Sequence, residues 1–231
     1  MKMNFLVLIL LVFFVCNEDS NENIRISKEI ETIEKLTTPD SLLTPGQRKV
    51  LNGAKLTLRH GYEYDMTMGY YITEYNDKGQ YIGERVFPGG DINPDIGVCT
   101  DVIIRALRLG EVIDLQKALN EDIKKAVKDY PMHRWSSKKP DPNIDQRRVM
   151  NLEVWFGKYW TQLNTEDDWQ PGDIVVWDMA KSGNSDHIGI VSDKIVNGRY
   201  WVIHNHPDPG FVAEEDKLFY WKISGHYRIK E

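Results

Sequence analysis

One cysteine has the surroundings of a nucleophile. Cys99 follows a stretch rich in glycine and proline, residues 87–97, and precedes an apolar stripe that runs to Leu107. Glycine and proline interrupt helices, so we expect Cys99 in the first turn of a new helix. Unpaired backbone N–H groups and the positive end of a helix dipole lower the pKa of a thiol, and the same groups can form an oxyanion hole. The pattern predicts a reactive thiol; the alternative is a small buried apolar side chain.

A thiol nucleophile needs a base, and two of the six histidines lie on predicted strands. His187 opens one run of β-branched residues and His204 closes the next, with the hairpin signal Asn197-Gly198 between them. Side-chain alternation places both imidazoles on one face of the sheet. The simplest two-residue turn pairs Val191 with His204, which leaves His187 about 13 Å away. Direct contact between the histidines therefore requires a wider loop or a β-bulge.

Further residues are candidates for substrate binding: Tyr64, Asp65, Asp101, Arg147 and Arg148. The first two can line a substrate cleft or pack in the core. Asp101 lies in the predicted first turn, where an acidic residue complements the helix dipole. Arg147 and Arg148 can bind a substrate carboxylate. Alternatively, the two arginines form structural ion pairs with Asp141 or Asp145.

Helical patterns come first in the chain and strand patterns afterwards. Thr44-Pro45 is typical of a helix start, and Gly61 of its end. A second helix is expected over residues 98–109, followed by an irregular helical region up to residue 165. Beyond Pro171, β-branched and aromatic runs predict strands over residues 173–177, 187–192, 200–205 and 218–229. This order predicts an α+β domain with helices packed on an antiparallel sheet.

The N-terminal residues have the pattern of an export signal and a tether. Residues 1–15 combine one lysine with an apolar run that is shorter than the roughly 20 residues of a membrane span, so we expect a signal peptide. Cys16, followed by polar and acidic residues, resembles the end of a bacterial lipoprotein signal, although Val15 is larger than the usual residue there. We expect Cys16 to carry a lipid, residues 16–40 to form a flexible tether, and residues 41–231 to fold. The expected location is the periplasm or cell surface, anchored to the membrane through the lipid.

Composition excludes several classes of protein. The net charge of −6 over 231 residues argues against a nucleic-acid partner, which would favour a basic domain. Two cysteines are too few for a disulfide scaffold or a four-cysteine zinc site. Hydrophobic residues make up 41% of the chain, enough for a buried core. We expect a monomer that needs neither metal nor cofactor.

The order of these candidates resembles a known superfamily. A cysteine at a helix start, a histidine at the head of a strand and a polar residue on the next strand resemble the NlpC-like, papain-related cysteine peptidases of bacterial cell walls. Pro171-Gly172-Asp173 before an apolar strand resembles the same enzymes. Residues 45–229 are also similar to a bacterial family catalogued as domain of unknown function number 1287. The segments that carry this second resemblance are Tyr64-Asp65, Pro88-Gly89-Gly90-Asp91, residues 97–106, Asp114-Leu115-Gln116, residues 140–148, residues 187–192 and residues 224–228.

The resemblance implies a papain-like NlpC-type fold, in which the helix that begins at Cys99 packs on a C-terminal antiparallel sheet. It implies that Cys99 is the nucleophile, that His187 is its base and later general acid, and that His204 is the third residue of the triad. Asn205 is the alternative third residue. The implied reaction is hydrolysis of an amide in peptidoglycan stem peptides through an acyl-thioester. The sequence departs from the family pattern at residues 206–209, where a smaller turn is usual.

Two other functions remain open from the sequence. His204-Asn205-His206, with His187 and Asp208, has the residue types of a zinc-dependent hydrolase site. A non-catalytic cell-wall binding module on the same fold is the second alternative. Within the enzyme class, an amine can intercept the thioester in place of water, which would give acyl transfer.

Overall fold

The computed structural model describes residues 43–66, 78, 86–135, 139–166 and 168–231. All of them belong to one compact unit, Thr38–Glu231. The predicted signal peptide, the tether and the lipidation site Cys16 lie outside the described residues. Within the described ranges, no helix has the length and apolar character needed to cross a membrane.

The helices precede most of the strands, as the sequence predicts. Helix α2 begins after Thr44, whose hydroxyl accepts a hydrogen bond from the backbone N–H of Gln47, and ends at Gly61 in the left-handed conformation. The α-helices are α2 (Pro45–His60), α3 (Cys99–Leu109), α4 (Leu115–Lys125) and α5 (Val149–Tyr159). Short 3-10 turns η2 (Val127–Asp129), η3 (Met132–Arg134) and η4 (Asp145–Arg147) connect the last two helices.

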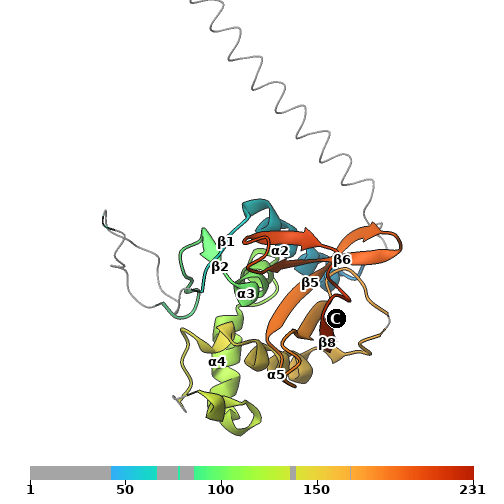
Figure 1. Cartoon of the computed structure of the whole chain (residues 1–231). Helices are drawn as coiled ribbons and strands as arrows, with labels where there is room; N and C mark the ends of the chain where they lie inside the picture. The colour runs from blue at the N-terminus through green and yellow to red at the C-terminus, as the bar shows by residue number, and fades with distance from the viewer. Residues whose placement is uncertain (1–42, 67–77, 79–85, 136–138, 167) are drawn as a thin grey trace, which may run out of the picture. The chain divides into compact units, whose positions relative to one another are not determined.

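The strands form one antiparallel sheet and one small ribbon. The sheet has the order β3-β8-β4-β5-β6-β7 and consists of β3 (Thr161–Gln162), β4 (Ile174–Asp178), β5 (His187–Val196), β6 (Arg199–Asn205), β7 (Val212–Glu215) and β8 (Lys222–Arg228). The parallel ribbon pairs β1 (Glu63–Tyr64) with β2 (Ile96–Gly97). The α+β class is confirmed, and Figure 1 shows α3 beside the sheet.

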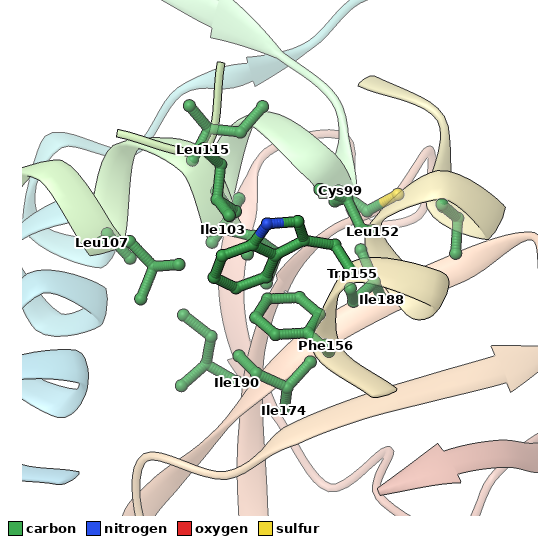
Figure 2. Close-up of a cluster of buried hydrophobic side chains, with 14 of the residues drawn as sticks. Cys99, Ile103, Leu107, Leu115, Leu152, Trp155, Phe156, Ile174, Ile188 and Ile190 are labelled. Atoms are coloured by element: carbon green, nitrogen blue, oxygen red, sulfur yellow. The ribbon is translucent and has the colours of Figure 1, made fainter. Parts of the chain in front are cut away.

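The two faces of the sheet belong to different clusters of buried side chains. Ile188 and Ile190 of β5 face the helices and join the larger core. Val191, with Trp177 of β4, joins a smaller cluster on the opposite face. Figure 2 shows Cys99 at the edge of the larger core, with Ile188 and Leu152 in the same group. The helix that begins at Cys99 therefore packs on the sheet, as expected.

A bulge in β5 changes the pairing of the central hairpin. The turn at Asn197-Gly198 is confirmed, and positive φ angles of 53° and 75° match the tight hairpin turn that this dipeptide favours. The register then shifts between Val191 and Ile195, so that Val191 pairs with Val202. The simple register, with Val191 opposite His204, is wrong. Continuing the observed pairing from Ile190 and Ile203 places His204 opposite Gly189, only two residues from His187.

A lysine from α2 holds the bulge. The Nζ atom of Lys55 lies 2.9 Å from Ser192 Oγ, 2.6 Å from Asp193 Oδ1 and 2.6 Å from Glu214 Oε1. The Ser192 hydroxyl also donates to Glu214 of β7. Irregular strand residues lose ladder hydrogen bonds, and here the backbone N–H of Lys194 donates instead to Ser192 Oγ at 3.2 Å. The register that joins the two histidines thus depends on a residue far away in the sequence.

Candidate active site

Cys99 is the first residue of α3, as predicted. Asp101 Oδ2 accepts a hydrogen bond of 2.7 Å from the backbone N–H of Val98 and so caps the helix start. Gly97 packs tightly just before this turn: a Cβ atom there would lie 3.0 Å from Asp101 Cβ and 3.2 Å from Arg105 Nη1, so both side chains would have to shift.

The predicted low pKa of Cys99 is wrong. The side chain is buried, with 7% of the residue exposed, and burial raises the pKa of the thiol to about 12. Hydrogen bonds from the backbone of Ile188 and Thr100 favour the thiolate, while the negative charge of Asp101 disfavours it. Loss of hydration outweighs the helix terminus here. At rest, Cys99 is therefore a neutral thiol beside the start of β5.

The structure brings the two predicted histidines into contact. Nε2 of His187 lies 2.8 Å from Nδ1 of His204, with the rings nearly perpendicular at 82°. Both side chains are buried. Burial and the neighbouring histidines hold the pKa of His187 well below its usual range, and burial lowers the pKa of His204 as well. Both imidazoles are therefore neutral near neutral pH, so His187 is able to accept a proton.

Aromatic side chains surround the histidine pair. Trp177 stacks on His187 with ring centroids 5.3 Å apart and an interplanar angle of 26°. The half-buried Trp221 lies with its centroid 5.4 Å from that of His187 and 5.2 Å from that of His206. The indole N–H of Trp177 donates to the backbone oxygen of Leu218 at 3.0 Å, which fixes that ring. These contacts limit rotation of His187 and exclude water from its ring.

A further group on the histidine pair has no signal in the sequence. Oε2 of Glu215, at the end of β7, lies 3.1 Å from Nε2 of His204. This hydrogen bond is the main reason that the pKa of Glu215 is lowered. The sequence does not reveal Glu215 because β7 is short and its pairing with β6 is set only in the folded sheet.

Asn205 lies on the opposite face of β6 from His204. Its Nδ2 donates to the backbone oxygen of Gly97 at 3.1 Å and also lies near the carbonyls of Tyr62 and Glu63. These bonds tie β6 to the ribbon that leads into Cys99. His204, and not Asn205, is hydrogen-bonded to His187.

The candidate substrate-binding arginines are engaged by carboxylates. Arg147 makes two hydrogen bonds to Asp101, from Nε at 3.0 Å and from Nη2 at 2.9 Å. Arg148 pairs with Asp145 at 2.6 Å and covers the ring of Trp135 at 4.0 Å from its centroid. The predicted ion pair of Arg148 with Asp145 is present. These contacts support structural roles for Asp101 and both arginines.

Tyr64 and Asp65 lie on or next to the ribbon beside the nucleophile. Tyr64 is half-buried in β1, and its pKa is raised by burial and by the charge that Cys99 would carry as a thiolate. Asp65 is exposed, and its backbone N–H donates to the Gly97 oxygen at 2.9 Å. Tyr64 is thus near enough to the thiol for its pKa to respond to the charge of Cys99.

The donor geometry does not favour the zinc alternative. Nε2 of His187 and Nδ1 of His204 are hydrogen-bonded to each other, and Nδ1 of His206 lies 3.1 Å from the backbone oxygen of Asp208. These nitrogens are therefore already engaged within the protein. Across residues 43–66, 78, 86–135, 139–166 and 168–231, no three or more His, Cys, Asp or Glu side chains are grouped as a metal-ligand set. The hydrogen bond between His187 and His204 is instead suited to holding one imidazole in a fixed tautomer.

Comparisons with known proteins identify the family. A solved structure titled "Structure of NlpC1 from Trichomonas vaginalis" aligns with 84% of this chain, at 17% identity and a TM-score of 0.44, and the chain covers 46% of that structure. A protein of Escherichia coli (strain K12), "Uncharacterized protein YijF", is 46% identical over 149 residues, which are 63% of this chain and 70% of that protein. The profile described as "Domain of unknown function (DUF1287)" matches residues 70–229. The chain therefore belongs to this family.

Proposed function

We propose that this protein is an exported cysteine hydrolase that cleaves an amide bond through an acyl-thioester on Cys99. The observation that carries the proposal is the buried hydrogen bond between His187, at the start of β5, and His204. Ile188, the residue after His187, is hydrogen-bonded to Cys99 through its backbone. A neutral thiol, a neutral imidazole and a second imidazole that orients the first are the parts that thiol-based acyl transfer needs.

The reaction begins with general-base catalysis. His187 takes the thiol proton as the sulfur of Cys99 attacks the carbonyl carbon, which yields a tetrahedral oxyanion and an imidazolium. Backbone N–H groups at the start of α3 are the candidate donors to the oxyanion. Collapse of this intermediate breaks the C–N bond, and His187 returns the proton to the leaving amine. The product of this half-reaction is an acyl-thioester on Cys99.

Hydrolysis repeats these steps with water. His187 removes a proton from water as its oxygen attacks the thioester carbon, and the C–S bond then breaks. The proton goes to the departing sulfur, which regenerates the thiol and releases a carboxylic acid. When an amine takes the place of water, the same site forms a new amide.

The proposed substrate is a stem peptide of peptidoglycan. Two sequence features support this choice: the resemblance to cell-wall peptidases and the export pattern of residues 1–15. The proposal includes a lipid on Cys16, which would hold the enzyme at the membrane on the side where peptidoglycan lies. Mass spectrometry of the membrane-extracted protein tests the lipid separately.

Digestion of purified peptidoglycan with mass analysis of the products tests the activity. The wild-type protein should release fragments with a new amine and a new carboxylate, while Cys99→Ala and His187→Ala should release none. His133→Gln, which changes an exposed histidine outside the site, is the matched control and should retain full turnover. Full activity in Cys99→Ala would rule out the thiol mechanism. Binding without turnover in the wild-type protein would favour the non-catalytic cell-wall module.

A further inference from the structure

We infer that Glu215 is a positioning residue that sets the tautomers of His204 and His187 and leaves Nδ1 of His187 free as the base. The tautomers follow from the hydrogen bonds alone. Their catalytic consequence rests on the function proposed above. The inference extends the three expected site residues, Cys99, His187 and His204, by a fourth group that touches neither the thiol nor the substrate.

The hydrogen bond between Glu215 and His204 determines which nitrogen of His204 carries hydrogen. An ionised carboxylate has acceptor oxygens and no proton to donate. Oε2 of Glu215 lies 3.1 Å from Nε2 of His204, so Nε2 must carry the hydrogen of this bond. His204 is buried and neutral, so it has one N–H, and its Nδ1 is left with a lone pair.

The tautomer of His204 in turn determines the tautomer of His187. Nδ1 of His204 lies 2.8 Å from Nε2 of His187 and can only accept a hydrogen there. Nε2 of His187 must then be the N–H donor. A neutral imidazole has a single N–H, so Nδ1 of His187 carries a lone pair. This is the protonation state that a general base for a thiol requires.

The other charged groups around His204 do not supply an alternative acceptor. Lys217, just beyond β7, has three donor hydrogens and no acceptor atom. Its positive charge lowers the pKa of both His204 and Glu215, as does the neighbouring His206. Nδ1 of His206 is occupied by the backbone of Asp208. Glu215 is therefore the residue that selects the Nε2–H form of His204.

The opposite tautomer would disable the site. A hydrogen on Nδ1 of His204 would donate to Nε2 of His187, and the hydrogen of His187 would then occupy Nδ1. That nitrogen could no longer accept the thiol proton. Removing the carboxylate should therefore slow the chemical step without weakening substrate binding, because Glu215 acts through His204.

Nitrogen-15 NMR of histidine-labelled protein tests the tautomers directly. The spectra are recorded above pH 6.5, the ordinary pKa of an imidazole, so that both rings are neutral. In the wild-type protein, the Nε2 atoms of His187 and His204 should carry hydrogen and both Nδ1 atoms should not. Glu215→Leu should produce a mixture of forms at both rings. Glu215→Gln, whose amide oxygen still accepts, should largely restore the native form.

Asp216→Asn is the matched control, because it removes one negative charge from the adjacent residue, whose carboxylate pairs with Arg199. It should leave both tautomers unchanged. A wild-type His204 with hydrogen on Nδ1, or unchanged tautomers in Glu215→Leu, would overturn the inference. These readouts require no turnover, so they remain decisive even when the proposed hydrolase activity is wrong.

Kinetics on a peptidoglycan fragment supply the second readout. Glu215→Leu should lower kcat by about 10- to 100-fold, the range typical of removing the hydrogen-bond partner of a metal-bound histidine, with KM unchanged. Glu215→Gln should recover part of kcat, and Asp216→Asn should match the wild type. A rise in KM with unchanged kcat would contradict a positioning role and indicate direct substrate contact.

Discussion

Cys99 should react slowly with a disulfide reagent near neutral pH, because it is a buried neutral thiol at rest. The assay uses 4,4′-dithiodipyridine with the Cys16→Ser variant, in which Cys99 is the single remaining thiol of the two in the sequence. The folded protein is compared with the same chain unfolded in guanidinium. Only the thiolate attacks the reagent, so the rate reports the fraction of Cys99 that is ionised.

The expected difference follows from the two pKa values. The pKa of Cys99 rises from 9.0 to about 12, so the thiolate fraction near neutral pH falls about 1,000-fold. A thiolate of higher pKa is more nucleophilic, and a Brønsted coefficient of about 0.4–0.5 recovers roughly 16- to 32-fold of that loss. The net expectation is a reaction about 30- to 60-fold slower than in the unfolded chain. Burial of the sulfur slows the folded protein further.

The pH dependence separates this state from a pre-formed thiolate–imidazolium pair. The rate of the folded protein should keep rising with pH beyond 9.0, where the unfolded chain levels off. His187→Gln should leave the rate near neutral pH unchanged, because the resting thiol does not depend on the imidazole for its ionisation. Reaction of the folded protein as fast as the unfolded chain, with a plateau in the acidic range that His187→Gln abolishes, would refute the reasoning.

Two further predictions concern stability. Lys55→Met should lower the free energy of unfolding in urea by about 3 kcal/mol, because Asp193 would lose its 2.6 Å ion pair and Glu214 would keep only Lys194, at 3.8 Å. The melting temperature should also fall as the pH decreases below 6.5, because the pKa values of His187 and His204 are lower in the folded protein, so the unfolded chain takes up protons first. Thermal scans across this range measure the effect.

Each stability prediction has a control in the same chain. Lys49→Met removes an exposed lysine from the same helix and should leave the free energy of unfolding unchanged. An equal loss in both lysine variants would argue against a specific role for the bulge contacts. The exposed His133 serves for the pH series: His133→Gln should keep the acid sensitivity, whereas His187→Gln combined with His204→Gln should reduce it. Unchanged sensitivity in the double variant would contradict the assignment to these two rings.

The local features of the site were predictable from the sequence. The position of Cys99 follows from glycine and proline before it and an apolar helical stripe after it. The turn at Asn197-Gly198 follows from the readiness of both residues to adopt positive φ. The shared face of His187 and His204 follows from alternation along strands. Each of these inferences depends on neighbours within a few residues.

The features that the sequence could not supply depend on distant contacts. The bulge in β5 is held by Lys55, which lies 137 residues from Ser192 along the chain. Glu215 meets His204 only because β7 pairs with β6. The pKa of Cys99 is set by burial against the core, which outweighs the helix terminus that local sequence reveals. Local sequence patterns therefore predicted the residue types of the site. They did not predict the pairing register of β5 with β6, the contact of Glu215 with His204, or the neutral state of the Cys99 thiol.

The proposed function requires His187, at the head of β5, to reach Cys99, at the start of α3, and the geometry of the strand bears on this requirement. Consecutive strand residues point to opposite faces, so Ile188 faces the core that contains Cys99, while His187 faces the cluster around Trp177. A thiol on one face can meet an imidazole on the other only around the end of the strand. His187 is the first residue of β5, and Ile188 contacts the sulfur through its backbone. Further along the same face there is no room for a side chain, because a Cβ atom at Gly189 would lie 3.0 Å from the ring of Trp177. Under the proposed function, His187 therefore acts on Cys99 from the end of the strand, where it also hydrogen-bonds to His204.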